Sequence, residues 1–594
     1  MPEDPNVKYR PSLIEENPAF LVWLILLGAY LLLVVIAKYA WFIRDEQIVE
    51  ATLWLVLLVM AIFVVVHQFL RSGKIREQAW PNQLPTVPTR GERDLVEKAW
   101  NEESAVVLGY DVHGKPWKWA DETRVMQALV LGQTGSGKTT LLRNIITQDL
   151  MRRVGPADDR RKIPMVIFDG KGDLEFFHSL LPYIHRAGRM GDLRLLNPSR
   201  PELSVQYNPF ASEDDNYMAQ VSMIFGAFDL HDEFFAKHQL NYLADIVRIL
   251  HYTGKRFNFY DVMVMALDQS VIEDQVAAAR LRMAKDPEIS TQRRLNFEMS
   301  AKNLFQSFGD RDRVPKIQGL LNECMTFLDD ELSVITGPYD NLLSINDVID
   351  NELILFVSLN INKNTAPVRA LGKMMLQNLQ LVVGKRYETE TERKRRNKPL
   401  FSVVMDEFAP FGYRNFAQIL NTARGTNTAF LFSLQSLPQL LEVGKGFQQD
   451  VSSAPGTTML MQTRDEETAK YFKQASSQVP VQKRTQQLWR KDFLGFESYD
   501  KAIGASEREQ LEFRALDHHI KNLGKGKMEI LMTDPVQGTL HGRLHVRPPS
   551  DIRVPLFEPS LLPKLESSRE EAEGANLRFK DQKLAAMVPF PRRR

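Results

Sequence analysis

A glycine-rich segment beside one lysine has the composition of a polyphosphate-binding loop. The stretch from Leu129 to Leu142 reads LVLGQTGSGKTTLL and fits the P-loop pattern Gly-x4-Gly-Lys-Thr. In such a loop, backbone N–H groups and the positive end of the following helix face the phosphates. Lys138 would reach the β- and γ-phosphates of ATP, and the Thr139 hydroxyl would ligate Mg²⁺. The predicted nucleotide-binding residues are Gly132, Gln133, Thr134, Gly135, Ser136, Gly137, Lys138, Thr139 and Thr140.

Phosphoryl chemistry also needs a carboxylate near Mg²⁺ and a group that activates water. The segment LFSVVMDEF is an apolar run that ends in Asp406 and Glu407, far downstream of the P-loop. Asp406 would hold the Mg²⁺ shell as a Walker B aspartate does, and Glu407 would orient or deprotonate the attacking water. An isolated acidic pair at a strand end is common, but here it accompanies a P-loop.

Two further polar residues flank the next apolar run, TAFLFSLQS, which reads as a strand. Gln435 at its end could contact the γ-phosphate as a sensor, although an ordinary strand-end amide is the alternative. Arg424 precedes it in a loop, where it is either a surface arginine or a finger that acts in a neighbouring subunit's site. We therefore take Lys138, Glu407, Gln435 and Arg424 as the candidate catalytic residues.

The elements that must position these residues alternate between strands and helices. Continuous apolar strands such as ELILFVSLN and LFSVVMDEF predict an α/β fold with a parallel sheet covered on both faces. Between them, 211–336 shows apolar residues at helical spacing and no convincing strand, so we expect an inserted all-α domain. The nucleotide-binding domain then has two parts, 76–210 with the P-loop and 337–546 with the Walker B strand, followed by a flexible tail over 547–594.

The N-terminal region, 1–75, is predicted to be a transmembrane hairpin. FLVWLILLGAYLLLVVIA and ATLWLVLLVMAIFVVV are apolar runs, each long enough with its flanks to span a bilayer, and a short connector joins them. The flanks carry Lys8, Arg10, Arg71, Lys74 and Arg76, which places both termini and the nucleotide site in the cytoplasm by the positive-inside rule. A cleaved signal peptide would have a shorter apolar region, and a pair of buried core helices would be less uniformly apolar.

Composition limits the remaining function classes. The net charge is +1 over 594 residues, which is not the profile of a static nucleic-acid coat but leaves room for a local basic channel. Two basic groups are candidates for phosphate contacts, with a solvated connector as the alternative: Arg393, Lys394, Arg395 and Arg396, and Arg152, Arg153, Arg160 and Arg161. The single cysteine, Cys324, excludes a disulfide framework within the chain and fits a reducing compartment.

Several of these segments together resemble one family. The two N-terminal spans, GQTGSGKTT, DGKGDL, YNPF, the helical insertion, MDEF and ARGTNTAFLFSLQS follow the order seen in type IV secretion coupling proteins, the TraG/TraD-like conjugative ATPases. The resemblance implies a hexameric RecA-like motor at the bacterial inner membrane that uses ATP and Mg²⁺. It also implies single-stranded DNA with a relaxase or accessory proteins, and secretion-channel subunits, as partners. The family often has Gly-Arg where this chain has Arg424-Gly425.

Other motor classes fit the sequence less well. A septal, FtsK/HerA-like DNA translocase usually has more spans and a C-terminal winged helix, and neither is found here. A secretion-channel assembly ATPase would normally lack the hairpin anchor. A small-molecule ABC transporter would carry a Leu-Ser-Gly-Gly-Gln signature, which this chain lacks. The sequence therefore favours a coupling ATPase and leaves open whether DNA, protein or both are its cargo.

Overall fold

The computed structural model describes residues 104–549, apart from short gaps, and three isolated N-terminal residues. The chain divides into two units, 1–83 and 84–594, and the sheet, its helices and the candidate site all lie in the second. The predicted spans lie outside the described residues except at those three positions, and the tail lies outside them from 550 onward. Within the described residues, no helix has the length and apolar character needed to cross a membrane. The gaps are 156–158, 173–174, 212–215, 229, 231–232, 362–364, 392–397, 477, 494–495 and 536–537, and the isolated residues are Gly28, Tyr30 and Trp54.

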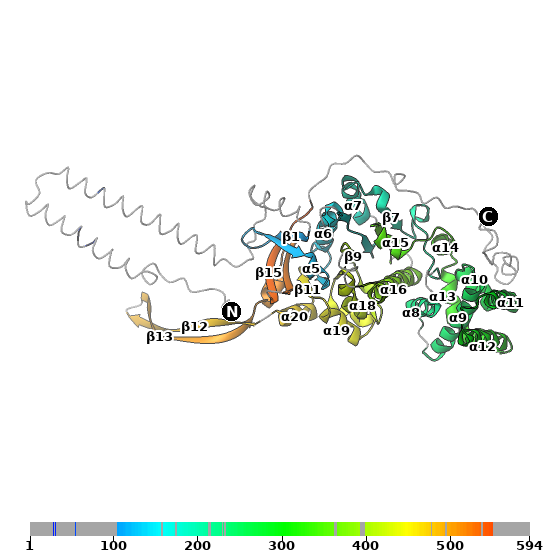
Figure 1. The fold of residues 1–594 in the computed structure, drawn as a ribbon. Coiled ribbons are helices and arrows are strands. Elements are labelled where there is room, and N and C mark those ends of the chain that lie inside the picture. Colours follow the sequence, from blue (N-terminus) through cyan, green and yellow to red (C-terminus); the bar gives the residue numbers. More distant parts are fainter. Residues whose placement is uncertain are drawn as a thin grey trace, which may run out of the picture. The chain divides into compact units, whose positions relative to one another are not determined.

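One mixed sheet organises the described residues (Figure 1). Seven neighbouring strands are parallel, as the sequence predicts, and four more extend one edge of the sheet in antiparallel pairings. The predicted parallel sheet is therefore found in these seven strands, and the antiparallel edge adds to it. In sheet order the strands are β2 (Pro116–Ala120), β1 (Ala105–Tyr110), β15 (Gly538–Val546), β14 (Lys527–Asp534), β11 (Thr457–Leu460), β3 (Ala128–Leu131), β10 (Thr428–Leu434), β9 (Phe401–Asp406), β6 (Met165–Asp169), β8 (Ile354–Ser358) and β7 (Leu193–Leu196).

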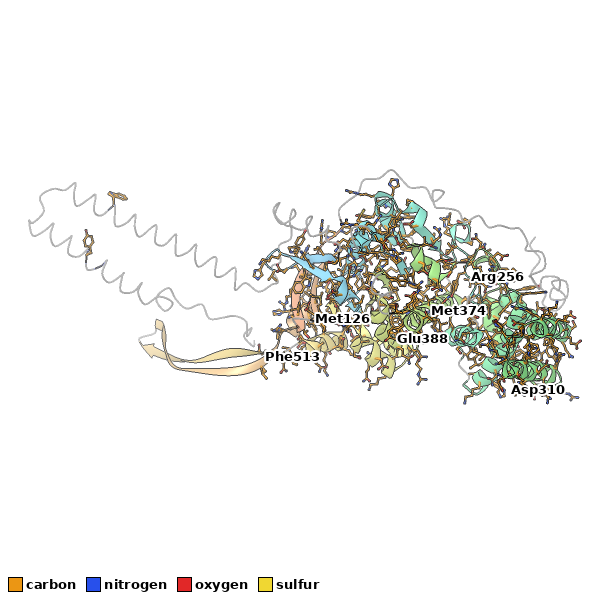
Figure 2. All side chains as sticks on the ribbon, viewed as in Figure 1. Met126, Arg256, Asp310, Met374, Glu388 and Phe513 are labelled. Atoms are coloured by element: carbon orange, nitrogen blue, oxygen red, sulfur yellow. The ribbon has the colours of Figure 1, made fainter. Side chains whose placement is uncertain are left out.

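Both faces of the parallel region are buried, which explains why its strands are continuously apolar. Alternate residues of a strand point to opposite faces, and two separate hydrophobic clusters divide them accordingly. Helices α6 (Lys138–Met151) and α7 (Glu175–Arg186) cover one face. Helices α16 (Thr365–Thr389) and α18 (Phe416–Ala423) cover the other, where Met374 of α16 is fully buried (Figure 2).

The region predicted to be an all-α insertion consists of packed helices (Figure 1). Its two ends lie side by side, because Gln206 forms a parallel bridge with Leu342. The side-chain amide of Asn208 links the two ends, since it donates to the carbonyl of Pro338 at 3.4 Å as well as to that of Phe257 at 2.9 Å. The helices are α8 (Tyr217–Ala227), α9 (Glu233–Thr253), α10 (Phe259–Leu267), α11 (Gln269–Lys285), α12 (Thr291–Phe308), α13 (Arg313–Thr326) and α14 (Asp330–Thr336), followed by α15 (Ile345–Asp350) before β8.

A long two-stranded ribbon interrupts the second part of the nucleotide-binding domain, and the sequence did not predict it. Strands β12 (Gln478–Phe493) and β13 (Phe496–Phe513) pair with each other in antiparallel register (Figure 1). The remaining elements are α5 (Asp121–Arg124), β4 (Arg153–Val154), β5 (Arg161–Lys162), α19 (Lys445–Ser453), α20 (Glu466–Ala475), α21 (Asp517–Lys521) and the short 3-10 helices η1 (Met190–Asp192), η2 (Pro201–Leu203), η3 (Ala409–Phe411), η4 (Arg424–Thr426) and η5 (Leu437–Glu442).

Candidate nucleotide-binding site

The P-loop connects β3 to α6, and its glycines have conformational reasons to be there. Gly135 and Gly137 adopt φ angles of 81° and 110°, in the left-handed region that favours glycine. A Cβ at Gly132 would lie 2.9 Å from both Met461 Cβ and Ser136 Oγ, so the loop passes too close to its neighbours for a side chain there. Thr134 and Gly135 are exposed at the tip of the loop.

Backbone hydrogen bonds hold the P-loop against the strands beside it. Gln133 N donates to the carbonyl of Gln462 at 2.8 Å, beyond the end of β11. Gly526 N, just before β14, donates to the carbonyl of Ser136 at 2.9 Å. The antiparallel edge of the sheet therefore has a direct part in shaping the phosphate-binding loop.

Lys138 starts α6 and folds back over the loop. Its Nζ donates to the carbonyl of Gly132 at 2.5 Å and to that of Gln133 at 3.3 Å. Burial lowers the pKa of Lys138, and the cation of Lys171 acts in the same direction, whereas Asp406 and Glu407 oppose the shift. The two hydrogen bonds hold the amino group of Lys138 at the loop that would cradle a polyphosphate.

Asp406, the last residue of β9, meets the P-loop helix directly. The Thr139 hydroxyl donates to Asp406 Oδ2 at 2.9 Å, although 267 positions separate the two residues. The Ser433 hydroxyl, from β10, donates to Asp406 Oδ1 at 2.8 Å, so both carboxylate oxygens of this buried residue have partners. Hydroxyl and carboxylate oxygens are the ligands that Mg²⁺ prefers, and adjacent ligands of an octahedral Mg²⁺ lie about 3 Å apart. Thr139 and Asp406 therefore fit a magnesium site.

Glu407 turns the chain sharply after β9. Its φ of 59° is in the left-handed region, where a glutamate is uncommon and strained. Its backbone N–H donates to Ser433 Oγ at 3.1 Å, which stabilises this turn. The side-chain amide of Gln435, just beyond β10, donates to Glu407 Oε1 at 3.0 Å. The structure thus brings Glu407 and Gln435 together at the same edge of the sheet as the P-loop.

The site contains a second lysine to which the sequence reasoning gave no role. Lys171 follows β6, and its Nζ lies 3.1 Å from Asp406 Oδ2 and 3.3 Å from Thr139 Oγ1. Burial alone would lower its pKa, but the carboxylates of Asp406, Glu407 and Asp169 outweigh burial, so the pKa of Lys171 is raised. The sequence signal that could have indicated a site role for Lys171 was its position in the DGKGDL motif, just after a buried strand.

Arg424 is not part of this cluster. It lies in η4, exposed, immediately before β10, whereas Gln435 follows the same strand. Because β10 has seven residues, the two ends are about 20 Å apart. Arg424 therefore lies at the opposite edge of the sheet from the P-loop of its own subunit.

The structure describes only one of the two basic groups that were candidates for phosphate contacts. Arg152 is buried and pairs with Asp149 at 2.7 Å and with Asp121 at 3.0 Å, and Arg161 pairs with Glu352 at 2.7 Å. Both arginines are thus engaged in ion pairs within the fold. The run from Arg393 to Arg396 lies outside the described residues.

Comparisons with known proteins bear on the fold and the family rather than on individual site residues. Among solved structures, the unbound monoclinic form of the bacterial conjugative coupling protein TrwBdeltaN70 is 15% identical, with a TM-score of 0.51 over 78% of this chain and 92% of that one. At this identity the likeness concerns the fold alone. The plasmid coupling protein TrwB in complex with ADP and Mg²⁺ is 15% identical, with a TM-score of 0.45 over 78% of this chain and 94% of that one. VirB4 of Thermoanaerobacter pseudethanolicus is 12% identical, with a TM-score of 0.42 over 75% of this chain and 97% of that one.

Family membership comes from the sequence itself. No curated protein matches this chain. Residues 91–508, more than half of the chain, match the family model of type IV secretory system conjugative DNA transfer proteins. This segment contains the P-loop, the helical insertion, and the strands that carry Asp406 and Gln435. The chain therefore belongs to the type IV secretory system conjugative DNA transfer family.

Proposed function

We propose that this protein is the coupling ATPase of a conjugative type IV secretion system. ATP hydrolysis would drive single-stranded DNA, protein or both into the secretion channel. The observation that carries the proposal is the 2.9 Å contact between Thr139 and Asp406, because it joins the P-loop and the Walker B strand into one site. The solved relative TrwB in complex with ADP and Mg²⁺ supports the choice of ligand.

The residues of the site divide the chemistry among themselves. The P-loop N–H groups and Lys138 would bind the phosphates. Thr139 and Asp406 would hold Mg²⁺, which would neutralise phosphate charge. Glu407 accepts a proton from the attacking water or orients it. Gln435 donates through its amide to Glu407 Oε1 and would sense the γ-phosphate. Proton transfer by a positioned carboxylate accounts for about 10²–10⁴ in rate.

The membrane anchor, the assembly and the partners also belong to the proposal. The apolar runs over 20–37 and 48–70, with basic flanks, support two spans in the bacterial inner membrane with both termini and the ATPase domain in the cytoplasm. A homohexamer would place Arg424 of one subunit near the site of its neighbour, where it could stabilise transition-state charge. A relaxase, accessory proteins and channel subunits are the proposed partners.

A mating assay with a site variant tests the proposal. The gene in a conjugative donor is replaced by one encoding Asp406→Asn, and transfer frequency is measured alongside ATP turnover of the purified full chain. Removal of a metal-binding charge should reduce turnover at least about tenfold, and transfer should fall with it. Asp450→Asn, which changes an exposed aspartate of α19, is the matched control. Normal turnover by Asp406→Asn would refute the ATPase site, and normal transfer with reduced turnover would refute the coupling role.

A further inference from the structure

Two donors meet at one carboxylate oxygen of Asp406, the Walker B aspartate. Asp406 Oδ2 accepts hydrogen bonds from Thr139 Oγ1 at 2.9 Å and from Lys171 Nζ at 3.1 Å. The ammonium of Lys171 is also 3.3 Å from Thr139 Oγ1. Lys171 thus lies on the same two oxygens that would hold Mg²⁺.

Neighbouring strands fix the backbone of this lysine. Asp169, the last residue of β6, is in register with Asp406 of β9, and Lys171 N donates to Asp169 Oδ1 at 3.1 Å. Gly172 has a φ of 61°, and a Cβ there would approach the backbone N of Asn360 to 2.4 Å. The backbone on both sides of Lys171 is therefore constrained, and its long side chain is the part that can move.

The side chain of Lys171 can move toward a second carboxylate. It is 35% exposed, so it is not locked into the core. Its Nζ is already 3.9 Å from Oε1 of Glu407, the carboxylate that acts on water rather than on the metal. A rotation of the side chain would exchange Asp406 for Glu407 as the main partner of the ammonium.

A monovalent ammonium and a divalent metal cannot occupy one position, because like charges about 3 Å apart repel strongly. We propose that Lys171 is a competing counter-cation built into the magnesium site. It neutralises Asp406 while the metal is absent and is displaced toward Glu407 when Mg²⁺ arrives with nucleotide. This inference rests on the proposed function, because it assumes that Thr139 and Asp406 hold the metal. Because Lys171 competes with Mg²⁺ for Asp406, the phosphates of the nucleotide would be needed for the site to bind the metal tightly.

The test compares nucleotide binding with and without the metal. The dissociation constant of a fluorescent ADP derivative is measured for the full-length protein in Mg²⁺ and in excess chelator, and the ratio of the constant in chelator to that in Mg²⁺ reports the metal dependence. In Lys171→Met, Mg²⁺ no longer competes with an ammonium, and metal-free ADP loses a compensating cation. Both effects raise the ratio, by about tenfold or more.

Matched variants separate charge from structure. Lys171→Gln keeps a hydrogen-bond donor without the charge and should raise the ratio as Lys171→Met does, whereas Lys171→Arg keeps the charge and should raise it less. Lys162→Met is the control, because Lys162 sits just before β6, is 34% exposed and pairs with Asp192 at 2.8 Å. Its ratio should equal that of the wild type.

The outcomes are distinguishable. An unchanged ratio in both Lys171→Met and Lys171→Gln, with ADP still bound by the wild type, would overturn the role of Lys171 and leave the proposed function standing. Loss of Mg²⁺–ADP binding in both variants would overturn it as well, since the lysine would then be part of the loaded site. Failure of the wild type to bind ADP under either condition would instead refute the proposed function.

Discussion

The side-chain amide of Gln435 donates a hydrogen bond to Glu407 Oε1 at 3.0 Å. The two residues end neighbouring parallel strands, β10 and β9, whose carboxyl ends lie at one edge of the sheet. Glu407 is held from the backbone side as well, because its N–H donates to Ser433 Oγ. Glu407 is thus held both at its backbone N–H and at one carboxylate oxygen, beside the phosphate-binding loop. This is the geometry expected of a residue that orients water.

Glu407→Gln tests that role directly. The carboxamide is nearly isosteric and can still accept the hydrogen bond from Gln435, but it is too weak a base to take a proton from water. We expect ATP binding to be retained and ATP turnover to fall by about 10²–10⁴-fold. Glu442→Gln changes an exposed glutamate of η5 and should leave turnover unchanged. Hydrolysis at the wild-type rate by Glu407→Gln would show that the base lies elsewhere.

Lys138→Ala addresses binding rather than chemistry. The variant removes the cation that folds over the P-loop, so we expect ATP turnover to be abolished and nucleotide affinity to fall about tenfold or more. Membrane fractionation should still recover the protein with the membrane, because the predicted spans are untouched. Lys445→Ala is the matched control, since Lys445 also begins a helix directly after a glycine with positive φ, at Gly444. Retained turnover in Lys138→Ala would refute the assignment of the P-loop lysine.

The strands that carry the site could be predicted because each is an apolar run that ends in a polar motif. The predicted strand over 400–408 is found as β9, and the predicted strand over 428–436 as β10. Buried parallel strands have this signature because both faces are covered. The convergence of Asp406 and Thr139 then follows from the topology, since the carboxyl ends of parallel strands share one edge.

Lys171 and the ribbon could not be predicted in the same way. The role of Lys171 depends on β6 lying next to β9, and sheet order depends on long-range pairing that no local pattern specifies. The ribbon of β12 and β13 has polar and charged residues along most of both strands, so it lacks the alternation that marks a half-buried strand. The far position of Arg424 was deducible, because a residue that precedes a parallel strand lies at the opposite edge from one that follows it.

Arg424→Ala asks whether this distant arginine acts across a subunit boundary. Arg424 and the site lie at opposite ends of β10, about 20 Å apart, so a direct contact with bound nucleotide would have to be made in a neighbouring subunit. In the pure variant, we expect ATP turnover to fall by up to about 10³–10⁵-fold, the range for loss of an arginine finger. In mixtures of variant and wild-type protein, turnover should fall by more than the fraction of variant. Arg200→Ala, at a side chain that is 53% exposed, should give a mixture with unchanged turnover. A strictly proportional loss would count against action in trans.

A buried charge cluster at the far end of the P-loop helix sets a stability prediction. Asp149, fully buried near the end of α6, receives two hydrogen bonds from Arg124, at 2.8 and 2.5 Å, and one from Arg152 at 2.7 Å. Burial would raise the pKa of Asp149, but the two arginines outweigh burial and lower it to about 2. Because this pKa is depressed on folding, the ionised carboxylate stabilises the protein above about pH 4, and this contribution is lost as the pH falls toward 2.

Asp149→Asn removes the buried carboxylate that Arg124 and Arg152 share and leaves them only the less buried Asp121. Breaking a buried ion pair by removing one partner typically costs about 3–5 kcal/mol. We therefore expect a clear fall in the thermal unfolding midpoint at pH 7, and a smaller difference from wild type at the acidic end of the window, where the wild-type carboxylate is also neutral. Glu298→Gln is the matched control, because Glu298 accepts two hydrogen bonds from Arg280, at 2.9 and 2.6 Å, but both side chains are about half exposed. An exposed pair is worth at most about 1 kcal/mol, so its variant should unfold close to wild type. Equal midpoints for Asp149→Asn and Glu298→Gln would mean that the buried cluster does not stabilise the P-loop helix.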